Sequence, residues 1–255
     1  MKIHLPDFSA FSYFIGCLKV VNEEQTLTIT ENGIGAQSMD PSHVAMVSAK
    51  MNKTEKFSLA DFSSDEPEVK VTVNVSELTR VLDRIDKKEK VELEYDTVAN
   101  RFIVKATRSG QARTFKLYVM EPSEEELPSP KISFKADARI KTDALYEALK
   151  DVDLWSEHAV FESVDEAMAV IGKGDSGDNL TRWTKESEDL LEYKSDEDSK
   201  ATYTLSYLTS IIGQARKEAP VLRVRWSNDM PIEIEVESLK EGVEVTYHLA
   251  PCIGV

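Results

Sequence analysis

Apolar and polar residues alternate along several short segments of the chain. The alternation is strict in 69–75, 91–95, 222–226 and 232–236. A period of two places apolar side chains on one face of a β-strand and polar side chains on the other, which is typical of antiparallel sheets with one buried face. Weaker alternation predicts further strands at 25–30, 43–50, 102–106, 113–118, 132–136 and 243–249. The chain is therefore expected to be rich in β-structure.

Apolar residues at a helical period mark another set of segments. Positions i, i+3, i+4 and i+7 form one stripe per helix, which packs against a sheet while the opposite face stays in solvent. Ser76, Thr142 and Ser206 are predicted N-caps, because their side-chain oxygens can accept hydrogen bonds from free backbone N–H groups. The stripes are Phe11, Phe14, Ile15 and Leu18; Leu78, Val81, Leu82 and Ile85; Leu145, Ala148, Leu149 and Val152; and Leu208, Ile211, Ile212 and Ala215.

The two halves of the chain repeat one pattern. Segment 73–82 aligns with 203–212 at a constant offset of 130 residues, with Ser, Leu and Thr at matching positions. In both halves an alternating strand precedes the helix and another follows it. Segment 121–130, with three prolines and four glutamates, is predicted to be an exposed, extended linker. The prediction is an α+β protein of two similar domains, each with antiparallel sheets and two helices: residues 1–118 and 132–255, joined by a connecting loop at 119–131.

Composition narrows the class of function. The net charge of −15 argues against nucleic-acid binding unless the chain has a local basic face, since phosphate contacts need lysine and arginine. No apolar run approaches the ~20 residues of a transmembrane helix, and the first residues lack the apolar stretch of a signal peptide. Cys17 and Cys252 are expected to be free thiols in a reducing compartment. The expectation is a soluble, intracellular protein without membrane contact.

The sequence contains no recognisable catalytic constellation. Its four histidines have neither metal-ligand spacing nor a paired cysteine, and a nucleophile elbow, a Walker loop and a dinucleotide fingerprint are absent. The glycine-rich segment 172–177 lacks the Gly-Lys-Ser/Thr ending of a phosphate loop and is predicted to be a hairpin turn. We therefore expect a protein that is not an enzyme and that uses no cofactor and no metal ion.

Peptides spread along the whole chain match the motifs of one protein family. Residues 33–47, Gly-Ile-Gly-Ala-Gln-Ser-Met-Asp-Pro-Ser-His-Val-Ala-Met-Val, are similar to a Gly-x-x-x-Gln-x-Met-Asp-x-Ser-His-Val block. Residues 249–252, Leu-Ala-Pro-Cys, are similar to a Leu-Ala-Pro-Lys end, and segment 229–232 and the acidic linker fall in the same order. On these motifs the chain resembles the PCNA sliding clamps of archaea and eukaryotes.

The resemblance implies a trimeric ring, formed by this chain alone or with paralogous subunits, in which helices line a central hole and sheets form the outer wall. Such a ring is a sliding clamp, which encircles double-stranded DNA without reading its sequence and makes polymerases processive. The implied partners are DNA polymerase, a clamp loader, flap endonuclease and DNA ligase, which bind through short client motifs. The implied location is the cytoplasm of an archaeon or the nucleus of a eukaryote.

The resemblance also assigns residues to the face that meets DNA. Three of them lie opposite the apolar stripe of the second predicted helix, at i, i+4 and i+7. Ser12, Tyr13, Glu147 and Asp83 make the lining less positive than is usual in the family. Either DNA contact is concentrated on the second and fourth helices, or partner subunits of a heterotrimer supply the missing charge. The DNA-facing residues are Lys19, Arg80, Arg84, Lys87, Lys150, Arg216 and Lys217.

Two further surfaces follow from the resemblance. Unpaired strand edges at 113–118 and 179–185 are expected to join subunits, with Phe115 and Leu117 against Leu180 and Trp183 of the neighbour. Client motifs are expected in a groove whose flexible side chains can repack around different aromatic anchors. The groove residues are Met39, His43, Val44, Met46, Leu127, Pro130, Pro231, His248, Ala250 and Pro251.

A rival interpretation remains at this stage. The chain could be a clamp-like β-rich scaffold, or a heterotrimer subunit specialised for repair or checkpoint work, that is not a self-sufficient DNA clamp. The net charge of −15 and the acidic Glu147 favour this alternative. Salt-sensitive retention on closed circular DNA separates the two interpretations.

Overall fold

The computed structural model describes residues 1–5, 8–54, 67–121, 127 and 131–254. The chain separates into two compact units. The first unit comprises Met1–Pro41, Val47–Leu127 and Lys240–Val245, and the second comprises Ser42–Met46, Pro128–Leu239 and Thr246–Val255. A division of the chain at the linker alone would place Ser42–Met46 in the first unit and Lys240–Val245 in the second. Each unit therefore includes one short segment from the other half of the chain.

The first unit is built from two groups of strands. One sheet has the order β1-β6-β7-β8, and all its neighbours are antiparallel. In the other group β4, β3, β2 and β5 are neighbours in that order. The bounds are β1 (Lys2–Leu5), β2 (Glu24–Thr30), β3 (Gly33–Met39), β4 (Ala45–Asn52), β5 (Glu68–Asn74), β6 (Lys90–Asp96), β7 (Arg101–Arg108) and β8 (Gln111–Tyr118).

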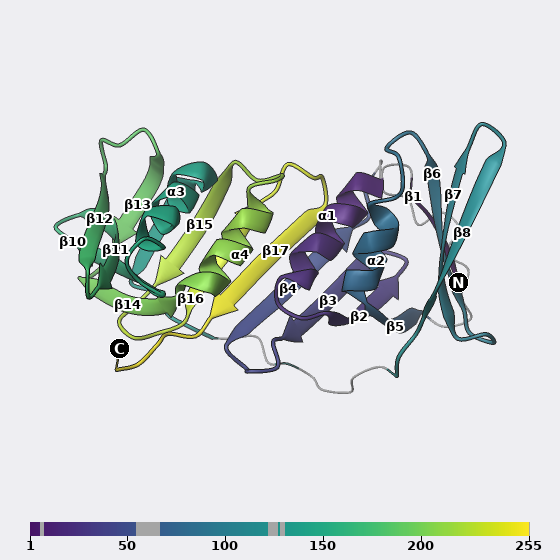
Figure 1. The fold of residues 1–255 in the computed structure, drawn as a ribbon, viewed down its shortest axis with the longest axis horizontal. Coiled ribbons are helices and arrows are strands. Elements are labelled where there is room, and N and C mark those ends of the chain that lie inside the picture. Colours follow the sequence, from purple (N-terminus) through teal and green to yellow (C-terminus); the bar gives the residue numbers. More distant parts are fainter. Residues whose placement is uncertain (6–7, 55–66, 122–126, 128–130, 255) are drawn as a thin grey trace. The chain divides into compact units, whose positions relative to one another are not determined.

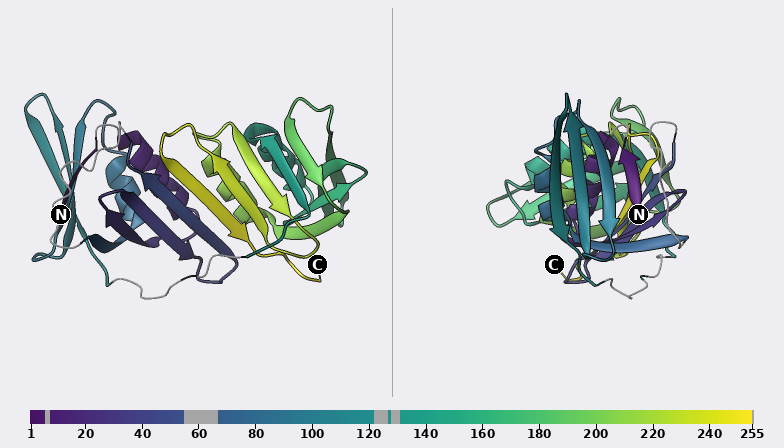
Figure 2. Two further views of the ribbon diagram at one scale, coloured as in Figure 1. Left: turned by 180° about the vertical axis from the view of Figure 1, so that it is seen from behind. Right: turned by 90° about the vertical axis from the view of Figure 1, so that its right-hand side faces the viewer.

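Two helices cover one face of this unit. Helix α1 (Phe8–Lys19) buries its whole predicted stripe, and α2 (Val75–Leu82) buries Leu78 and Leu82. The helices lie side by side in front of β2 and β3 in Figure 1, and the view from behind in Figure 2 shows the strands uncovered on the other face. Strand alternation explains this layering, because Leu27, Ile29 and Ala36 point into the covered face.

The second unit repeats this plan. One sheet has the order β12-β11-β10-β14, and β13, β9, β15 and β16 are antiparallel neighbours in that order. Helices α3 (Thr142–Val152) and α4 (Leu205–Ala215) bury their predicted stripes. The strands are β9 (Ala136–Lys141), β10 (His158–Val164), β11 (Ala167–Gly174), β12 (Gly177–Thr184), β13 (Leu190–Ser195), β14 (Ser199–Thr204), β15 (Val221–Trp226), β16 (Ile232–Glu237) and β17 (Val243–Leu249).

An aromatic cluster fills the core of the second unit. The Phe161 ring lies edge-on to Tyr203 and Trp226, with ring centroids 5.8 and 6.0 Å away. All three side chains are fully buried. Tyr203 keeps a polar partner, because its hydroxyl donates to the Met230 carbonyl at 2.8 Å, and burial strongly raises its pKa. The cluster joins both sheets of the unit, as expected for a two-layer core.

The predicted N-caps are wrong. The cap positions are Asn74 for α2, Lys141 for α3 and Thr204 for α4, and of these only the Asn74 side chain accepts a backbone hydrogen bond, from Glu77. The Ser76 hydroxyl donates to Glu23 at 2.8 Å, and the Thr142 hydroxyl donates to the Ala219 carbonyl at 2.7 Å. Ser206 is an exposed residue of the first turn of α4. Tertiary partners and the start of each helix one or two residues earlier override the local cap pattern.

Two loop predictions have different outcomes. The strand expected at 132–136 is wrong: residues 131–134 have no regular structure and β9 begins at Ala136. The glycine-rich turn is confirmed, since Gly174 pairs with Gly177 across the β11–β12 hairpin. A Cβ atom on Gly174 would lie 1.8 Å from the Trp155 carbonyl oxygen, and one on Gly177 would lie 2.4 Å from the Trp155 ring. These glycines therefore make room for Trp155 at the end of α3.

Within the described part of the chain, no helix is long and apolar enough to cross a membrane. The described histidine, cysteine, aspartate and glutamate side chains form no cluster suited to a metal ion.

Candidate functional site

The exposed face of α2 carries the clearest group of positive charges. The Asn74 side chain accepts a hydrogen bond from the Glu77 N–H at 2.9 Å and starts the helix, and burial of Leu78 and Leu82 fixes which face is outward. Arg80 and Arg84 are exposed. The helix ends at Leu82, earlier than the stripe predicted, and Arg84 follows in a tighter turn in which its N–H donates to the Val81 carbonyl.

The cations of α2 have no acidic partner among the residues that the structure describes. Neither Arg80 nor Arg84 nor the exposed Lys87 forms an ion pair with a described carboxylate, and the same holds for Lys19 at the end of α1. Their charge is therefore not offset locally and is available to an anionic partner.

The predicted cations of the second unit are engaged by its own side chains. Arg216 forms an ion pair with Asp143 at 2.9 Å and stacks on the Tyr146 ring, 4.3 Å from its centroid. Lys150 pairs with Asp153 at 3.2 Å, and Lys217 donates to the Gln214 amide oxygen at 2.8 Å. These exposed contacts are individually weak, but the acidic partners lower the local positive potential. The second unit thus offers less free positive charge than α2.

One residue of the predicted lining faces elsewhere. Tyr13 is buried, together with most of the side chains of α1. Its position, which is usually basic in the resembled family, is thus part of the core here, while Ser12 is half-buried and Glu147 is exposed.

The two predicted edge strands are both terminal strands of their sheets. In β8, Leu117 is buried, Phe115 is half-buried and Tyr118 is exposed. In β12, Trp183 faces its own core and is only 6% exposed, whereas Leu180 is 59% exposed. Because side chains alternate between the two faces of a strand, each edge strand has one side chain packed into its own core. Another side chain of the same strand is exposed, and a second chain can contact it.

One hollow lies beside the β8 edge, and another lies in the second unit between the end of α3 and the start of α4. A groove of about 560 Å³ runs between α2 and β8 and is lined by Glu77, Arg80, Val81, Arg84, Phe115, Lys116, Leu117 and Tyr118. In the second unit, a hollow of about 690 Å³ is lined by Asp153, Leu154, Trp155, Ser156, Glu157, Thr204, Leu205, Ser206 and Thr209. The first hollow combines apolar and basic side chains, and the second combines apolar and acidic ones.

The second unit holds most of the predicted client-groove residues. The Ala250 N–H donates to the Val44 carbonyl at 2.8 Å, which joins segment 42–46 to the chain after β17. Pro231 and Pro251 are half-buried, and His43 is exposed with a positive φ of 58°. The remaining predicted residues divide as follows: Met46 is buried, Met39 and Leu127 belong to the first unit and are half-buried, and Pro130 lies outside the described residues.

His248 places a polar ring beside a carboxylate in this otherwise apolar region. Its Nε2 atom lies 3.1 Å from a Glu233 carboxylate oxygen, and Arg225 forms an ion pair with the same carboxylate. Burial acts to raise the pKa of Glu233, but the hydrogen bond with His248 and the charge of Arg225 outweigh it and hold the pKa below its usual value. The guanidinium of Arg225 also stacks on Phe134. The side chains of Arg225, Glu233 and His248 thus form a polar row across the neighbouring strands β15, β16 and β17.

Comparison with known proteins assigns the family. Residues 1–126 match the family described as proliferating cell nuclear antigen, N-terminal domain. A DNA polymerase sliding clamp of Methanococcus vannielii is 32% identical over 245 residues, which cover 92% of this chain and 94% of that protein. One from Thermofilum pendens is 28% identical over 254 residues, covering 98% of each. The chain belongs to the PCNA family of sliding clamps. The resemblance read from segments 33–47 and 249–252 is confirmed.

Solved clamp structures share the fold. PCNA from Thermococcus kodakaraensis superimposes with a TM-score of 0.86 at 21% identity, covering 98% of this chain and 99% of that one. A PCNA2–PCNA3 complex from Sulfolobus tokodaii gives a TM-score of 0.83 at 23% identity, with 98% and 99% covered. The predicted fold class, an α+β clamp of two similar halves with antiparallel sheets and paired helices, is confirmed.

Some residues of this clamp subunit that border the hollows were not found from the sequence. Leu154 is 70% exposed directly after α3, and Trp155 and Tyr118 are also exposed. Leu154 follows the apolar stripe of α3 out of phase with it, and this mismatch is the signal that could have revealed it, whereas Trp155 continues the spacing three residues after Val152. Tyr118 lies under Arg101, whose guanidinium carbon is 3.8 Å from the ring centroid.

Proposed function

We propose that this sliding-clamp subunit encircles duplex DNA as part of a trimeric ring and tethers replication and repair enzymes to it without catalysing a reaction. The observation that carries the proposal is the uncompensated positive face of α2 in a member of the clamp family. Arg80, Arg84 and Lys87 are exposed there without a described acidic partner. Exposed, mobile cations suit contacts with the phosphate backbone, which do not depend on sequence.

DNA contact is proposed to be concentrated on α2. Lys19 adds one free charge from α1, while Lys150, Arg216 and Lys217 contribute less because their own neighbours engage them. This proposal narrows the alternative in which DNA contact is concentrated on the second and fourth helices. It also explains how a chain of net charge −15 can hold DNA, because the charge of the surface that faces the DNA determines binding and the net charge of the chain does not.

Assembly is proposed to occur through the edges of β8 and β12. The apolar side of the groove beside β8, which includes Phe115 and Leu117, offers a surface to the neighbour, and Leu154 and Trp155 offer an apolar surface in the second unit. Head-to-tail contact between unlike surfaces closes a ring when the rotation between subunits permits it. The neighbour is a second copy or a paralogous subunit. In this arrangement residues 1–118 and 132–255 act as the two clamp domains, connected by 119–131.

Client enzymes are proposed to bind at the groove that includes Val44, Pro231, His248, Ala250 and Pro251. DNA polymerase, a clamp loader, flap endonuclease and DNA ligase are the expected clients, each through a short motif with aromatic anchors. Half-buried prolines and a methionine offer an apolar surface that adapts to different anchors. These partners make the protein an intracellular component of DNA replication and repair.

Retention on DNA tests the proposal. The ring is loaded on closed circular DNA and washed with salt, and the retained fraction is compared before and after the DNA is linearised. We expect retention on the circle and loss from the linear form. Replacing Arg80 and Arg84 with alanine should weaken retention while the solution mass stays unchanged, and Lys50→Ala, on an exposed position of β4, serves as the control. Equal retention on both DNA forms would rule out a topological clamp.

A heterotrimer is the second candidate. It is favoured by the engaged cations of the second unit, since paralogous subunits could supply the missing charge. Light scattering of the purified chain separates the candidates. A mass near three times 28.7 kDa supports a self-sufficient homotrimer, and a stable monomer or dimer supports a subunit that needs paralogues.

A further inference from the structure

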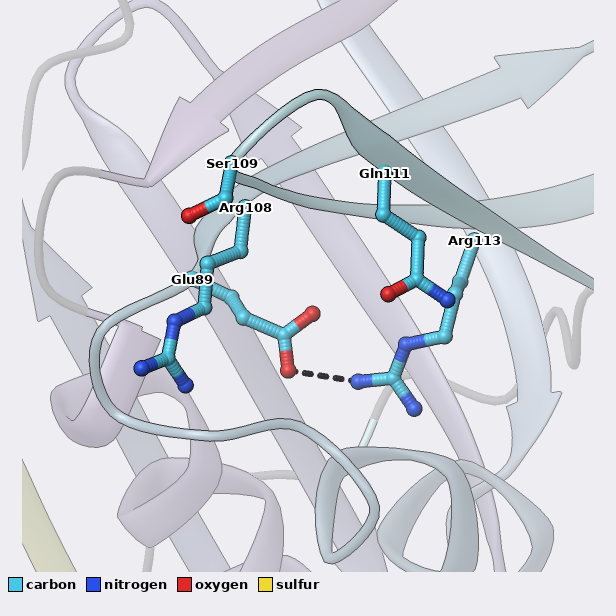
Figure 3. A pocket seen from close by; sticks show the side chains of 5 residues that line it. All are labelled: Glu89, Arg108, Ser109, Gln111 and Arg113. Carbon is cyan, nitrogen blue, oxygen red and sulfur yellow. Dashed lines mark hydrogen bonds and ion pairs between the residues drawn. The ribbon is translucent and has the colours of Figure 1, made fainter.

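The polar pocket beside α2 satisfies its own charges. It has a volume of about 390 Å³ and opens between the loop after α2 and the β7–β8 hairpin (Figure 3). The guanidinium of Arg113 donates to the Glu89 carboxylate at 2.5 Å, and Arg108 forms an ion pair with Asp86 at 3.6 Å. The three charged side chains that line this pocket each have a partner within the first unit, so their charges are already offset.

A second polar group of the first unit lies in its interior. Gln25 on β2 is fully buried, and Ser38 near the end of β3 is 8% exposed. The Gln25 side-chain nitrogen donates to the Ser38 hydroxyl at 2.7 Å, to the Asn22 carbonyl at 2.8 Å and to the Leu18 carbonyl at 3.2 Å. Asn22, Gln25 and Ser38 form what we call the amide hub.

The partners of the Gln25 amide fix its orientation. A backbone carbonyl can only accept a hydrogen bond, so the amide nitrogen and not the amide oxygen faces Leu18 and Asn22. Its two hydrogens are shared among three acceptors, and the Gln25 Oε1 atom is buried without a partner among the residues that the structure describes. A buried acceptor without a donor lowers the free energy of unfolding. Packing alone therefore does not account for a glutamine at this position.

Strand register explains why Gln25 meets Ser38. The backbone ladder between β2 and β3 ends with Thr28 opposite Gly35. The same register, continued along both strands, places Gln25 opposite Ser38. Beyond the end of the ladder, the side-chain hydrogen bond between these two residues therefore joins β2 to β3.

The amide hub connects the end of α1 to the end of β3. Leu18 belongs to the last turn of α1, where carbonyl groups need partners from beyond the helix, and Gln25 supplies one. The Asn22 side chain donates to the Met39 carbonyl at 3.0 Å. Because side chains alternate along a strand, buried Ser38 points into the unit and half-buried Met39 points to the opposite face. Hydrogen bonds to Ser38 and to Met39 thus hold the last two residues of β3.

We propose that the amide hub positions Met39 for client binding, so that Asn22, Gln25 and Ser38 are positioning residues of the client groove. The inference rests on the proposed function, with Met39 as a member of the predicted groove. The hub does not contact the client but fixes the direction in which the flexible Met39 side chain leaves β3. A groove that is ordered before binding loses less conformational freedom on binding, so client affinity depends on the hub.

A double-mutant cycle tests this role. The probe is a short fluorescent peptide with one aliphatic residue and a pair of adjacent phenylalanines, titrated with the full chain. Ser38→Ala is preferred to a change at Gln25, whose loss would leave two carbonyls without their donor. It should weaken peptide binding about 5-fold, as expected for the loss of one hydrogen bond that orders the groove. Ser38→Thr keeps the hydroxyl and should bind like the wild type. In a Met39→Ala background, Ser38→Ala should cause no further loss, because the hub acts through Met39.

Thr26→Val is the matched control. It removes one side-chain hydrogen bond, the 2.9 Å contact between Thr26 and Thr72, from the same strand β2. Chemical denaturation should show similar destabilisation of Thr26→Val and Ser38→Ala, and the solution mass and DNA retention should stay unchanged in both. Only Ser38→Ala should lose peptide affinity. An equal loss in Thr26→Val, or losses of Ser38→Ala and Met39→Ala that simply add, would show that the hub is a general stabiliser and would overturn the inference.

Failure of this inference and failure of the proposed function are distinguishable. If Met39→Ala weakens peptide binding but Ser38→Ala does not, the hub has no positioning role and the client groove stands. If the wild type does not bind the peptide, or Met39→Ala leaves the affinity unchanged, the groove assignment in the proposed function fails and this inference fails with it.

Discussion

Leu180 provides a direct test of ring assembly. It lies on the terminal strand β12, opposite Ile171, and is 59% exposed in the single chain. The replacement Leu180→Asp changes a side chain that contributes little to the core of its own unit. Exposed substitutions of this kind usually alter the free energy of unfolding by no more than about 0.5 kcal/mol, with up to about 1 kcal/mol for aspartate in a strand. The variant chain should therefore remain folded.

The effect on assembly should be larger. Full burial of a leucine side chain contributes about 1.5–3 kcal/mol, and the exposed 59% leaves about 1–2 kcal/mol to be gained on association. An aspartate placed at the same contact without a partner adds about 1–3 kcal/mol of desolvation cost. The sum is about 3 kcal/mol for each interface, so the dissociation constant should increase roughly 100-fold.

Light scattering over a protein dilution series measures this effect, and circular dichroism checks the fold. The control is Leu239→Asp, the same chemical change at a more exposed leucine that lies outside the strands. We expect the control to keep the wild-type mass at concentrations at which Leu180→Asp dissociates. A folded Leu180→Asp variant that keeps the wild-type mass at every dilution would refute the assignment of this edge to the interface.

Three further changes have expected outcomes. Replacing both Met39 and Leu127 with alanine should weaken client-peptide binding at least about 10-fold at unchanged solution mass, and unchanged affinity in a fluorescence titration would contradict the groove assignment. Phe161→Ala should lower the free energy of unfolding by about 3–5 kcal/mol in chemical denaturation, because it leaves a cavity between two buried aromatic rings. Arg139 donates to both Glu237 oxygens, at 2.6 and 2.7 Å, and lowers the pKa of Glu237 below its ordinary 4.5. The stability that this ion pair contributes is present above pH 4.5 and is lost as pH falls through the lowered folded-state pKa. Glu237→Gln should therefore reduce the loss of unfolding free energy between neutral and acidic pH in a series of denaturation curves. An unchanged loss would show that this ion pair does not stabilise the fold.

Prediction from the spacing of apolar residues succeeded where one face of a helix or strand is buried and the other is exposed to solvent. The stripes of α1, α3 and α4 are fully buried as expected, and the alternating segments 69–75 and 222–226 correspond to β5 and β15. It failed where the local pattern is weak. Strand β11 is almost uniformly apolar, and a continuous apolar run does not distinguish a strand from a helix segment.

Side-chain roles at the site were less predictable. Whether a cation is free depends on residues far away in the chain: Asp143 and Arg216 are 73 positions apart, and Glu89 and Arg113 are 24 apart. A helical wheel places Arg216 on an outward face but gives no information about its acidic neighbour. For the same reason the wheel did not reveal the pocket beside α2, whose walls come from a loop and a distant hairpin.

The sequence by itself determined the elements, the two-fold internal repeat and the family, because periodicity and motifs are local properties that each segment carries alone. Only the tertiary structure decided which helix starts depend on distant partners, which edge residues face outward and which cations remain unpaired. Ser76 and Thr142 match the local pattern of a cap, yet their hydroxyl groups bind Glu23 and the Ala219 carbonyl. The partner of each hydroxyl group depends on which strands and helices become neighbours in the fold. An interaction between segments that are distant in the sequence does not change the periodic pattern of either segment, so the pattern cannot predict it.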